Sequence, residues 1–141
     1  MQRRRADGYV RKIEFVFYNE EKIRAAIMDA RNLPRIPGDG GSQIGDPTAS
    51  QAIRNATPLQ KVRIDGECLE CPEAWLAVVE ATYKWCDHDR LIVARDRYSG
   101  IDYRETCAKL SISDATRRRL LADIRHYASL YAVQAGLIRI F

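Results

Sequence analysis

Apolar residues recur at intervals of three and four along most of this 141-residue chain, and this period constrains the fold more than any other feature. The spacing is typical of amphipathic helices, whereas strands alternate with a period of two. Near the N-terminus, the residues that show this helical spacing are Ile13, Val16, Phe17, Ile23, Ala26, Ile27 and Ala30. We therefore expect helix over residues 9–33, with a kink or break at Asn19.

The pattern stops in the stretch LPRIPGDGGSQIGDP, residues 33–47, which holds three prolines and four glycines. Proline and glycine at this density prevent a regular element. We expect an N-terminal helical segment over residues 1–33, a linker over residues 34–47 and a helical domain over residues 48–141. Asp46 as N-cap and Pro47 as first helical residue would open a short helix carrying Ala49, Ala52, Ile53 and Ala56.

The middle of the chain predicts two further helices, from Pro72 to Cys86 and from Asp89 to Tyr98. On a helical wheel with 100° per residue, the apolar residues of the first helix fall on one side, which we expect to form the centre of the core. These residues are Trp75, Leu76, Val78, Val79, Tyr83 and Trp85. Residues 58–66, which include KVRID, fit either a strand or a helical turn. No other β pattern stands out, so the expected fold class is all-α.

Length and composition indicate an ordinary globular protein, with 46% hydrophobic and 30% charged residues. A chain of this length most often forms one domain. No apolar run approaches the roughly 18 residues of a membrane span. The basic start, Met1 to Arg5, has no apolar core behind it and so does not resemble a signal peptide. We expect a cytoplasmic protein without a membrane partner.

Four side chains raise the question of a zinc site: Cys68, Cys71, Cys86 and His88. Structural zinc takes four N or S ligands, usually from two close pairs. The second pair is separated by only one residue, and Cys86 falls beside Trp75 and Val79 on the helical wheel, as a small core residue would. Neither histidine has a nucleophile at a recognisable spacing. We expect no metal, no cofactor and no enzymatic activity, and free thiols suited to a reducing compartment.

The net charge of +4 is unevenly distributed. Between Arg90 and His126 there are nine lysines and arginines against five acidic residues. Basic clusters attract polyanions such as nucleic acids, although such charges also serve simply to solvate helices.

The most informative segment lies between residues 102 and 131, where two helical patterns are separated by Ser111, Ile112 and Ser113. The first pattern, from Asp102 to Leu110, would turn Tyr103, Cys107 and Leu110 inward. A second helix starts near Asp114 and runs beyond Tyr131. Two helices across a three-residue turn, with small Cys107 at the close approach, Ile112 buried in the turn and Ser113 as N-cap, predict a C-terminal helix-turn-helix.

The second helix has an apolar face made of Leu120, Leu121, Ile124, Tyr127, Ala128 and Tyr131. The opposite face carries Ala115, Arg118, Arg119, Ala122 and His126. Arginines reach guanine edges or phosphates in the major groove, while alanines allow close approach. Arg117 lies at the edge of the apolar face, so we expect its stem to pack there and its head to reach solvent. The predicted DNA-binding residues are Ser113, Asp114, Ala115, Thr116, Arg118, Arg119 and Ala122.

The stretch ARDRYSGIDYRETCAKLSISDATRRRLLADI resembles the helix-turn-helix of the fourth region of sigma factors. The matching positions are Arg97, Tyr98, Tyr103, Glu105, Leu110, Ile112, Ser113 and Thr116. Three positions differ: Thr106 replaces an aliphatic residue, Ser111 the turn glycine, and Arg117 an aliphatic residue.

The layout of the whole chain, with the linker motif Asp46-Pro47-Thr48 and the closing AVQAGLIRI, is similar to the ArpU/RinA-type phage transcriptional regulators. This resemblance implies a phage or prophage activator of late genes that binds double-stranded promoter DNA and contacts RNA polymerase.

Two other functions fit the same pattern. One is a DNA-packaging adaptor like a terminase small subunit, which would form a homo-oligomer. The other is a helical interaction module that uses the basic face against an acidic protein such as RNA polymerase.

Overall fold

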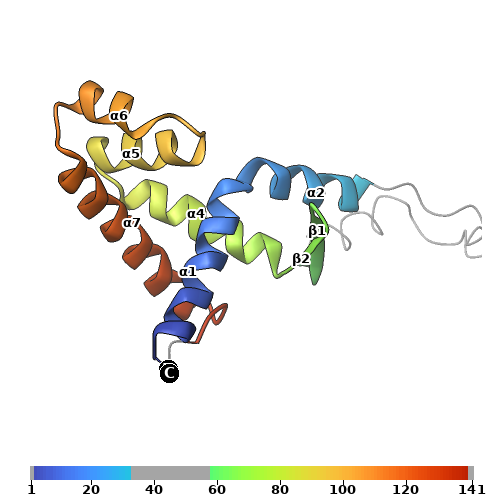
Figure 1. Ribbon diagram of the computed structural model, residues 1–141. Coiled ribbons are helices and arrows are strands. Elements are labelled where there is room, and N and C mark those ends of the chain that lie inside the picture. The colour runs from blue at the N-terminus through green and yellow to red at the C-terminus, as the bar shows by residue number, and fades with distance from the viewer. Residues whose placement is uncertain (1, 33–57, 140–141) are drawn as a thin grey trace, which may run out of the picture. The chain divides into compact units, whose positions relative to one another are not determined.

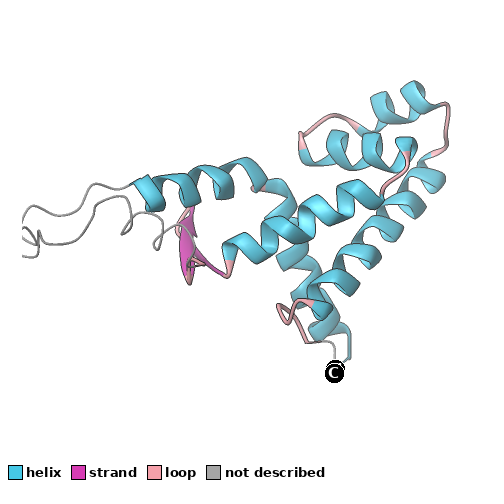
Figure 2. Ribbon diagram, turned by 180° about the vertical axis from the view of Figure 1, so that it is seen from behind, coloured by secondary structure: helices cyan, strands magenta, loops and turns pink. Residues whose placement is uncertain are grey.

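The computed structural model describes residues 2–32 and 58–139. These residues are mostly helical, with one small antiparallel sheet (Figures 1 and 2). The helices are α1 (Gln2–Tyr18), α2 (Glu20–Asn32), α4 (Pro72–Trp85), α5 (His88–Tyr98), α6 (Tyr103–Leu110) and α7 (Asp114–Gln134), and the strands are β1 (Lys61–Ile64) and β2 (Glu67–Glu70). The expected linker and the short helix around Ala52 lie outside the described residues. None of the described helices combines the length and apolar character needed to cross a membrane.

The break expected at Asn19 separates α1 from α2. The Asn19 side-chain amide donates a hydrogen bond of 2.8 Å to the carbonyl of Phe15, which also accepts from the Asn19 backbone N–H at 3.1 Å. Asparagine side chains compete in this way for backbone hydrogen bonds. The prediction of two helical patterns interrupted at this residue is confirmed.

The described residues form two compact units, residues 2–20 with 74–139 and residues 21–32 with 58–73. The smaller unit contains the hairpin β1–β2, in which Val62 pairs with Leu69 and Ile64 with Glu67. The turn residues Asp65 and Gly66 have φ of 51° and 85°. Asp-Gly with positive φ at both positions is the preferred two-residue turn of a hairpin.

The hairpin corrects the all-α prediction and decides the open question at residues 58–66 in favour of a strand. Along β1, Val62 and Ile64 are buried while Lys61 and Arg63 are exposed, so the period is two. The strands have only four residues each, too short for their alternation to stand out from the helical background.

In the larger unit, α5 packs against both α6 and α7, and α1 packs against α7 (Figures 1 and 2). Part of the core lies between α5 and α7 and consists of Val93, Ala94, Leu121 and Ile124. On α4, the expected core residues Trp75, Leu76, Val78 and Val79 are buried. This core holds α5, α6 and α7 as one unit.

Trp85 departs from the expected core face, because 42% of it is exposed. It is the last residue of α4, and its ring stacks on that of Tyr127 from α7, with centroids 4.5 Å apart and planes 8° from parallel. Its position at the end of the helix lets the ring stack on α7 and also lie beneath the guanidinium of Arg90, 5.5 Å from the ring centroid, while part of the ring reaches solvent. The helical wheel therefore gave the correct side of α4 but the wrong depth for this residue.

Candidate nucleic-acid interface

The candidate interface is built from α6, the three residues Ser111 to Ser113, and α7. The two predicted helices and the break between them are present. Asp102 caps α6 by accepting a hydrogen bond from the Arg104 backbone N–H at 3.1 Å. Ser113 caps α7 by accepting from the Thr116 backbone N–H at 3.1 Å, which confirms its predicted role as N-cap.

Backbone geometry makes the turn tight. Ser111 lies in the left-handed region, with φ 55° and ψ 46°, and its N–H donates to the carbonyl of Ala108 at 3.4 Å. The Ile112 N–H donates to the carbonyl of Cys107 at 3.0 Å. These bonds occupy carbonyls that the end of a helix otherwise leaves without partners. The chain can therefore reverse from α6 into α7 within three residues.

The apolar residues around the turn pack onto the core of the larger unit. Leu110, Ile112 and Leu120 are half-buried against the cluster shared by α5 and α7. This bears out the burial expected of Ile112 in the turn. Cys107 is also half-buried.

The inward face of α6 differs from the prediction. Tyr103 is 44% exposed, whereas Thr106 is only 2% exposed. The Thr106 hydroxyl donates a hydrogen bond of 2.9 Å to Asp96 on α5, which also accepts from Lys109 at 3.0 Å. This polar contact turns Thr106 toward α5 and carries Tyr103 toward solvent.

The predicted contact face of α7 is open to solvent. Ala115, Arg118, Arg119 and Ala122 are all exposed. Together with the exposed Ser113 they form what we call the α7 basic face. The other two predicted contact residues, Asp114 and Thr116, are partly exposed.

Asp114 sets the electrostatics at the start of α7. Its two carboxylate oxygens accept from Arg117 at 2.9 Å and from Arg118 at 2.8 Å. The hydrogen bond from Arg118, followed by that from Arg117, holds the pKa of the Asp114 carboxyl below its usual value. Arg118 keeps 73% of its side chain exposed. Arg119 makes no ion pair with any residue that the structure describes. The two arginines of the face therefore differ: Arg118 is held by Asp114, whereas Arg119 has no ion-pair partner among the described residues.

Arg117 packs more deeply than expected. Only 13% of its side chain is exposed. Its guanidinium lies 5.3 Å from the centroid of the Tyr103 ring and pairs with Asp114, so the charged head is held within the protein's own contacts. The prediction that the head reaches solvent was wrong, because an aromatic ring and a carboxylate are both available to it.

The cysteines do not gather into a recognisable metal site within residues 2–32 and 58–139, where no group of three or more Cys, His, Asp or Glu is suitably placed. Cys68 and Cys71 are exposed, while Cys86 is half-buried. Burial, with a smaller contribution from Asp87, raises the pKa of the Cys86 thiol to about 11. Cys86 is thus a neutral packing residue rather than a reactive thiol.

Sequence reasoning missed the buried pair of Asp96 and Thr106. A signal was present, because Asp96 follows Val93 by three residues and therefore shares its side of α5. A carboxylate on the buried side of a helix requires a donor. The hydroxyl of Thr106 on α6 supplies that donor.

Comparison of this chain with protein-family models, with curated proteins and with solved structures finds no match.

Proposed function

We propose that the chain is a sequence-specific DNA-binding protein of the transcription-regulator class, in which α7 enters the major groove and α6 supports it. The observation that carries this proposal is the α7 basic face, where two arginines and two alanines stay exposed on the first three turns of a capped helix. Arginines supply bidentate hydrogen bonds to guanine, and alanines let the helix backbone approach the bases.

The packing beneath α7 supports the same proposal. A recognition helix has to be held rigidly, because base contacts tolerate little displacement. The face opposite the exposed residues is fixed by Leu121 and Ile124 in the core, and α6 is fixed to α5 by the bond between Thr106 and Asp96. The exposed side chains therefore extend from a supported helix.

Within this proposal, the chain acts in the cytoplasm, at promoters of phage or prophage late genes, with RNA polymerase as a second partner and no catalytic role. The resemblance of the helix-turn-helix segment to sigma factors supports this assignment. A packaging adaptor is the main rival, and it would form a ring of many subunits, which light scattering would detect.

The experiment first takes DNA fragments from the genomic region around the gene and selects those that the full chain binds. Mobility shifts then measure the affinity for the selected site. The double variant Arg118→Ala/Arg119→Ala should weaken binding, by about 1–3 kcal/mol for each arginine that reaches a base. The matched control is Lys61→Ala/Arg63→Ala, which removes the same charge from two exposed positions of β1.

Equal affinity of both double variants for the selected site would contradict the placement of DNA on α7. If the unmodified chain binds no fragment even at low salt, DNA binding itself is wrong, because phosphate contacts are strongest there. Retention of RNA polymerase by the chain under those conditions would favour the interaction module instead.

A further inference from the structure

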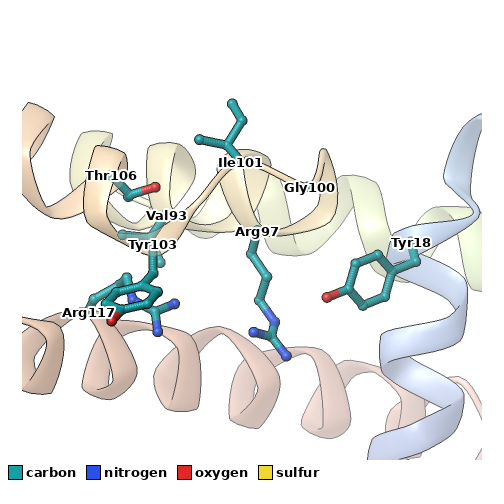
Figure 3. Close-up of a pocket in the computed structure, with 8 residues that line it drawn as sticks. All are labelled: Tyr18, Val93, Arg97, Gly100, Ile101, Tyr103, Thr106 and Arg117. Atoms are coloured by element: carbon teal, nitrogen blue, oxygen red, sulfur yellow. The ribbon is translucent and has the colours of Figure 1, made fainter.

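A pocket of about 260 Å³ opens in the larger unit, on a different side of α7 from the basic face. It is lined by Tyr18 of α1, Val93 and Arg97 of α5, Gly100 and Ile101 of the connection, Tyr103 and Thr106 of α6, and Arg117 of α7 (Figure 3). Arg117 precedes Arg119 by two residues, which is about 200° around a helix. A molecule in this pocket would therefore not occupy the proposed DNA-binding face.

Arg97 occupies the middle of the pocket, and its guanidinium lies between the ring of Tyr103 on one side and that of Tyr18 on the other (Figure 3). The buried Nε of Arg97 has no hydrogen-bond partner among the described residues. The Oε2 atom of Glu14, which is also buried and also without a hydrogen-bond partner among the described residues, lies 3.6 Å from it, an ion-pair distance beyond hydrogen-bond length. A buried guanidinium donor without an acceptor is costly, so an incoming oxygen would be stabilised here.

The charges around the pocket are not balanced. Of the lining arginines, Arg117 pairs with Asp114, and Arg97 shares Glu14 with Arg125. Three guanidinium groups thus face two carboxylates, since Arg118, the other partner of Asp114, lies on the α7 basic face. The surplus of positive charge favours an anion, and the planar fork of arginine matches the two oxygens of a carboxylate or phosphate.

The two tyrosines add a preference for a flat ring. Tyr18 is 48% and Tyr103 is 44% exposed, so part of each ring is accessible to a ligand. The guanidinium groups of Arg117 and Arg104 already lie 5.3 Å and 5.7 Å from the centroid of the Tyr103 ring. An aromatic group beside Arg97 could pack edge-on or offset against either tyrosine, as aromatic pairs prefer.

We propose that this pocket binds a small aryl oxyanion, an aromatic ring carrying a phosphate or a carboxylate, with Arg97 as the residue that grips the anion and Tyr103 as the residue that packs on the ring. The proposal does not depend on DNA binding, because it uses neither Arg119 nor the alanines of the α7 basic face.

Calorimetric titration of the full chain with three matched probes tests this assignment. Phenyl phosphate carries both ring and anion, inorganic phosphate carries the anion alone, and benzyl alcohol carries the ring alone. Phenyl phosphate should bind at least about tenfold more tightly than either of the others, since each charge-assisted bond and ring contact adds to the affinity. Benzoate in a parallel titration distinguishes a carboxylate from a phosphate preference.

The variants separate the two roles. Arg97→Ala should weaken phenyl phosphate binding by about tenfold or more, because it loses the charge-assisted hydrogen bonds. Arg97→Lys should weaken phenyl phosphate binding by less, because lysine keeps the positive charge beside Glu14 but lacks the planar guanidinium that bonds two oxygens. Tyr103→Ala should lower the affinity for phenyl phosphate and leave that for inorganic phosphate unchanged. Arg119→Ala should leave every probe unaffected, even if DNA binding is lost.

Three results would overturn the proposal. The first is that neither phenyl phosphate nor benzoate binds at millimolar concentration. The second is that the Arg97→Lys variant, shown by circular dichroism to be folded, binds phenyl phosphate with the same affinity as the unmodified chain. The third is that the probes fail to bind while Arg97→Ala weakens binding to selected DNA, in which case the pocket holds a backbone phosphate rather than a small molecule.

Discussion

The hydroxyl of Thr106 donates a hydrogen bond of 2.9 Å to the carboxylate of Asp96, and only 2% and 6% of these two residues is exposed. The bond joins α6 to α5 beneath the turn that leads into α7. A buried carboxylate is costly unless it receives hydrogen bonds, and here Thr106 and Lys109 provide them. The orientation of the candidate recognition helix thus rests partly on a polar contact inside the unit.

Thr106→Val removes this hydroxyl while keeping the shape of the side chain. We expect the free energy of unfolding to fall by about 1–3 kcal/mol, since the buried carboxylate loses a donor. Chemical denaturation measures the change. Thr82→Val is the matched control, because the buried Thr82 hydroxyl donates only to the carbonyl of Val78 on its own helix, at 2.7 Å. Equal losses in the two variants would show that the bond to Asp96 has no special role.

Ser111→Gly should stabilise the protein, because Ser111 holds a left-handed conformation with φ 55° that glycine adopts without strain. The expected gain in the free energy of unfolding is about 1 kcal/mol. Ser99→Gly gives the contrast, since Ser99 caps α5 with φ −96° and ψ 0°, where glycine only adds freedom to the unfolded chain. Thermal unfolding should therefore move up for Ser111→Gly and down slightly for Ser99→Gly.

The cysteines should react with iodoacetamide in a definite order. Burial raises the pKa of Cys86 to about 11, which lowers its thiolate fraction near pH 8, whereas Cys68 and Cys71 are exposed. The thiolate is the reactive form, so Cys86 should be alkylated last. Mass spectrometry of digested protein after timed quenching gives the order. Labelling of Cys86 as early as Cys68 in the native protein would contradict its assignment as a packing residue.

The same pKa predicts a loss of stability in alkali. A cysteine in an unfolded chain ionises near pH ~8.5, so the contribution of neutral Cys86 is complete below that pH and is lost as the pH rises toward 11. The unfolding free energy of the unmodified chain should consequently fall more between pH 8 and pH 10 than that of Cys86→Ala. Parallel curves for the two proteins would show that Cys86 does not contribute to the pH dependence.

Ala122→Glu places a negative charge on the α7 basic face and should reduce DNA affinity by about tenfold or more, through repulsion of phosphates and loss of close approach. Glutamate favours helix nearly as well as alanine, so circular dichroism should remain unchanged. The control is Gln134→Glu, which changes the charge equally at an exposed position at the far end of α7. Equal mobility shifts of the two variants on selected DNA would argue against contact through this face.

The helices that carry the candidate interface were predictable because their signals are local. The break at Asn19, the N-cap at Ser113 and the exposure of Arg118 and Arg119 each follow from a few neighbouring residues and the helical period. The hairpin was harder to predict, because two four-residue strands offer little periodicity and only the Asp65-Gly66 turn marks them.

Contacts between distant residues were decided by the tertiary structure alone. Asp114 precedes Arg117 by three residues, a spacing at which side chains meet on a helix, but nothing in the sequence near Arg117 indicates that the ring of Tyr103 will also hold its charged head in the protein. Likewise, Arg97 and Tyr18 meet in one pocket although 78 residues separate them, and Thr106 turns inward only because Asp96 lies opposite. Helical periodicity determines the direction in which each side chain points from its own helix. Whether that side chain is buried, and which group it pairs with, depends on the residues that the neighbouring helices bring into contact with it.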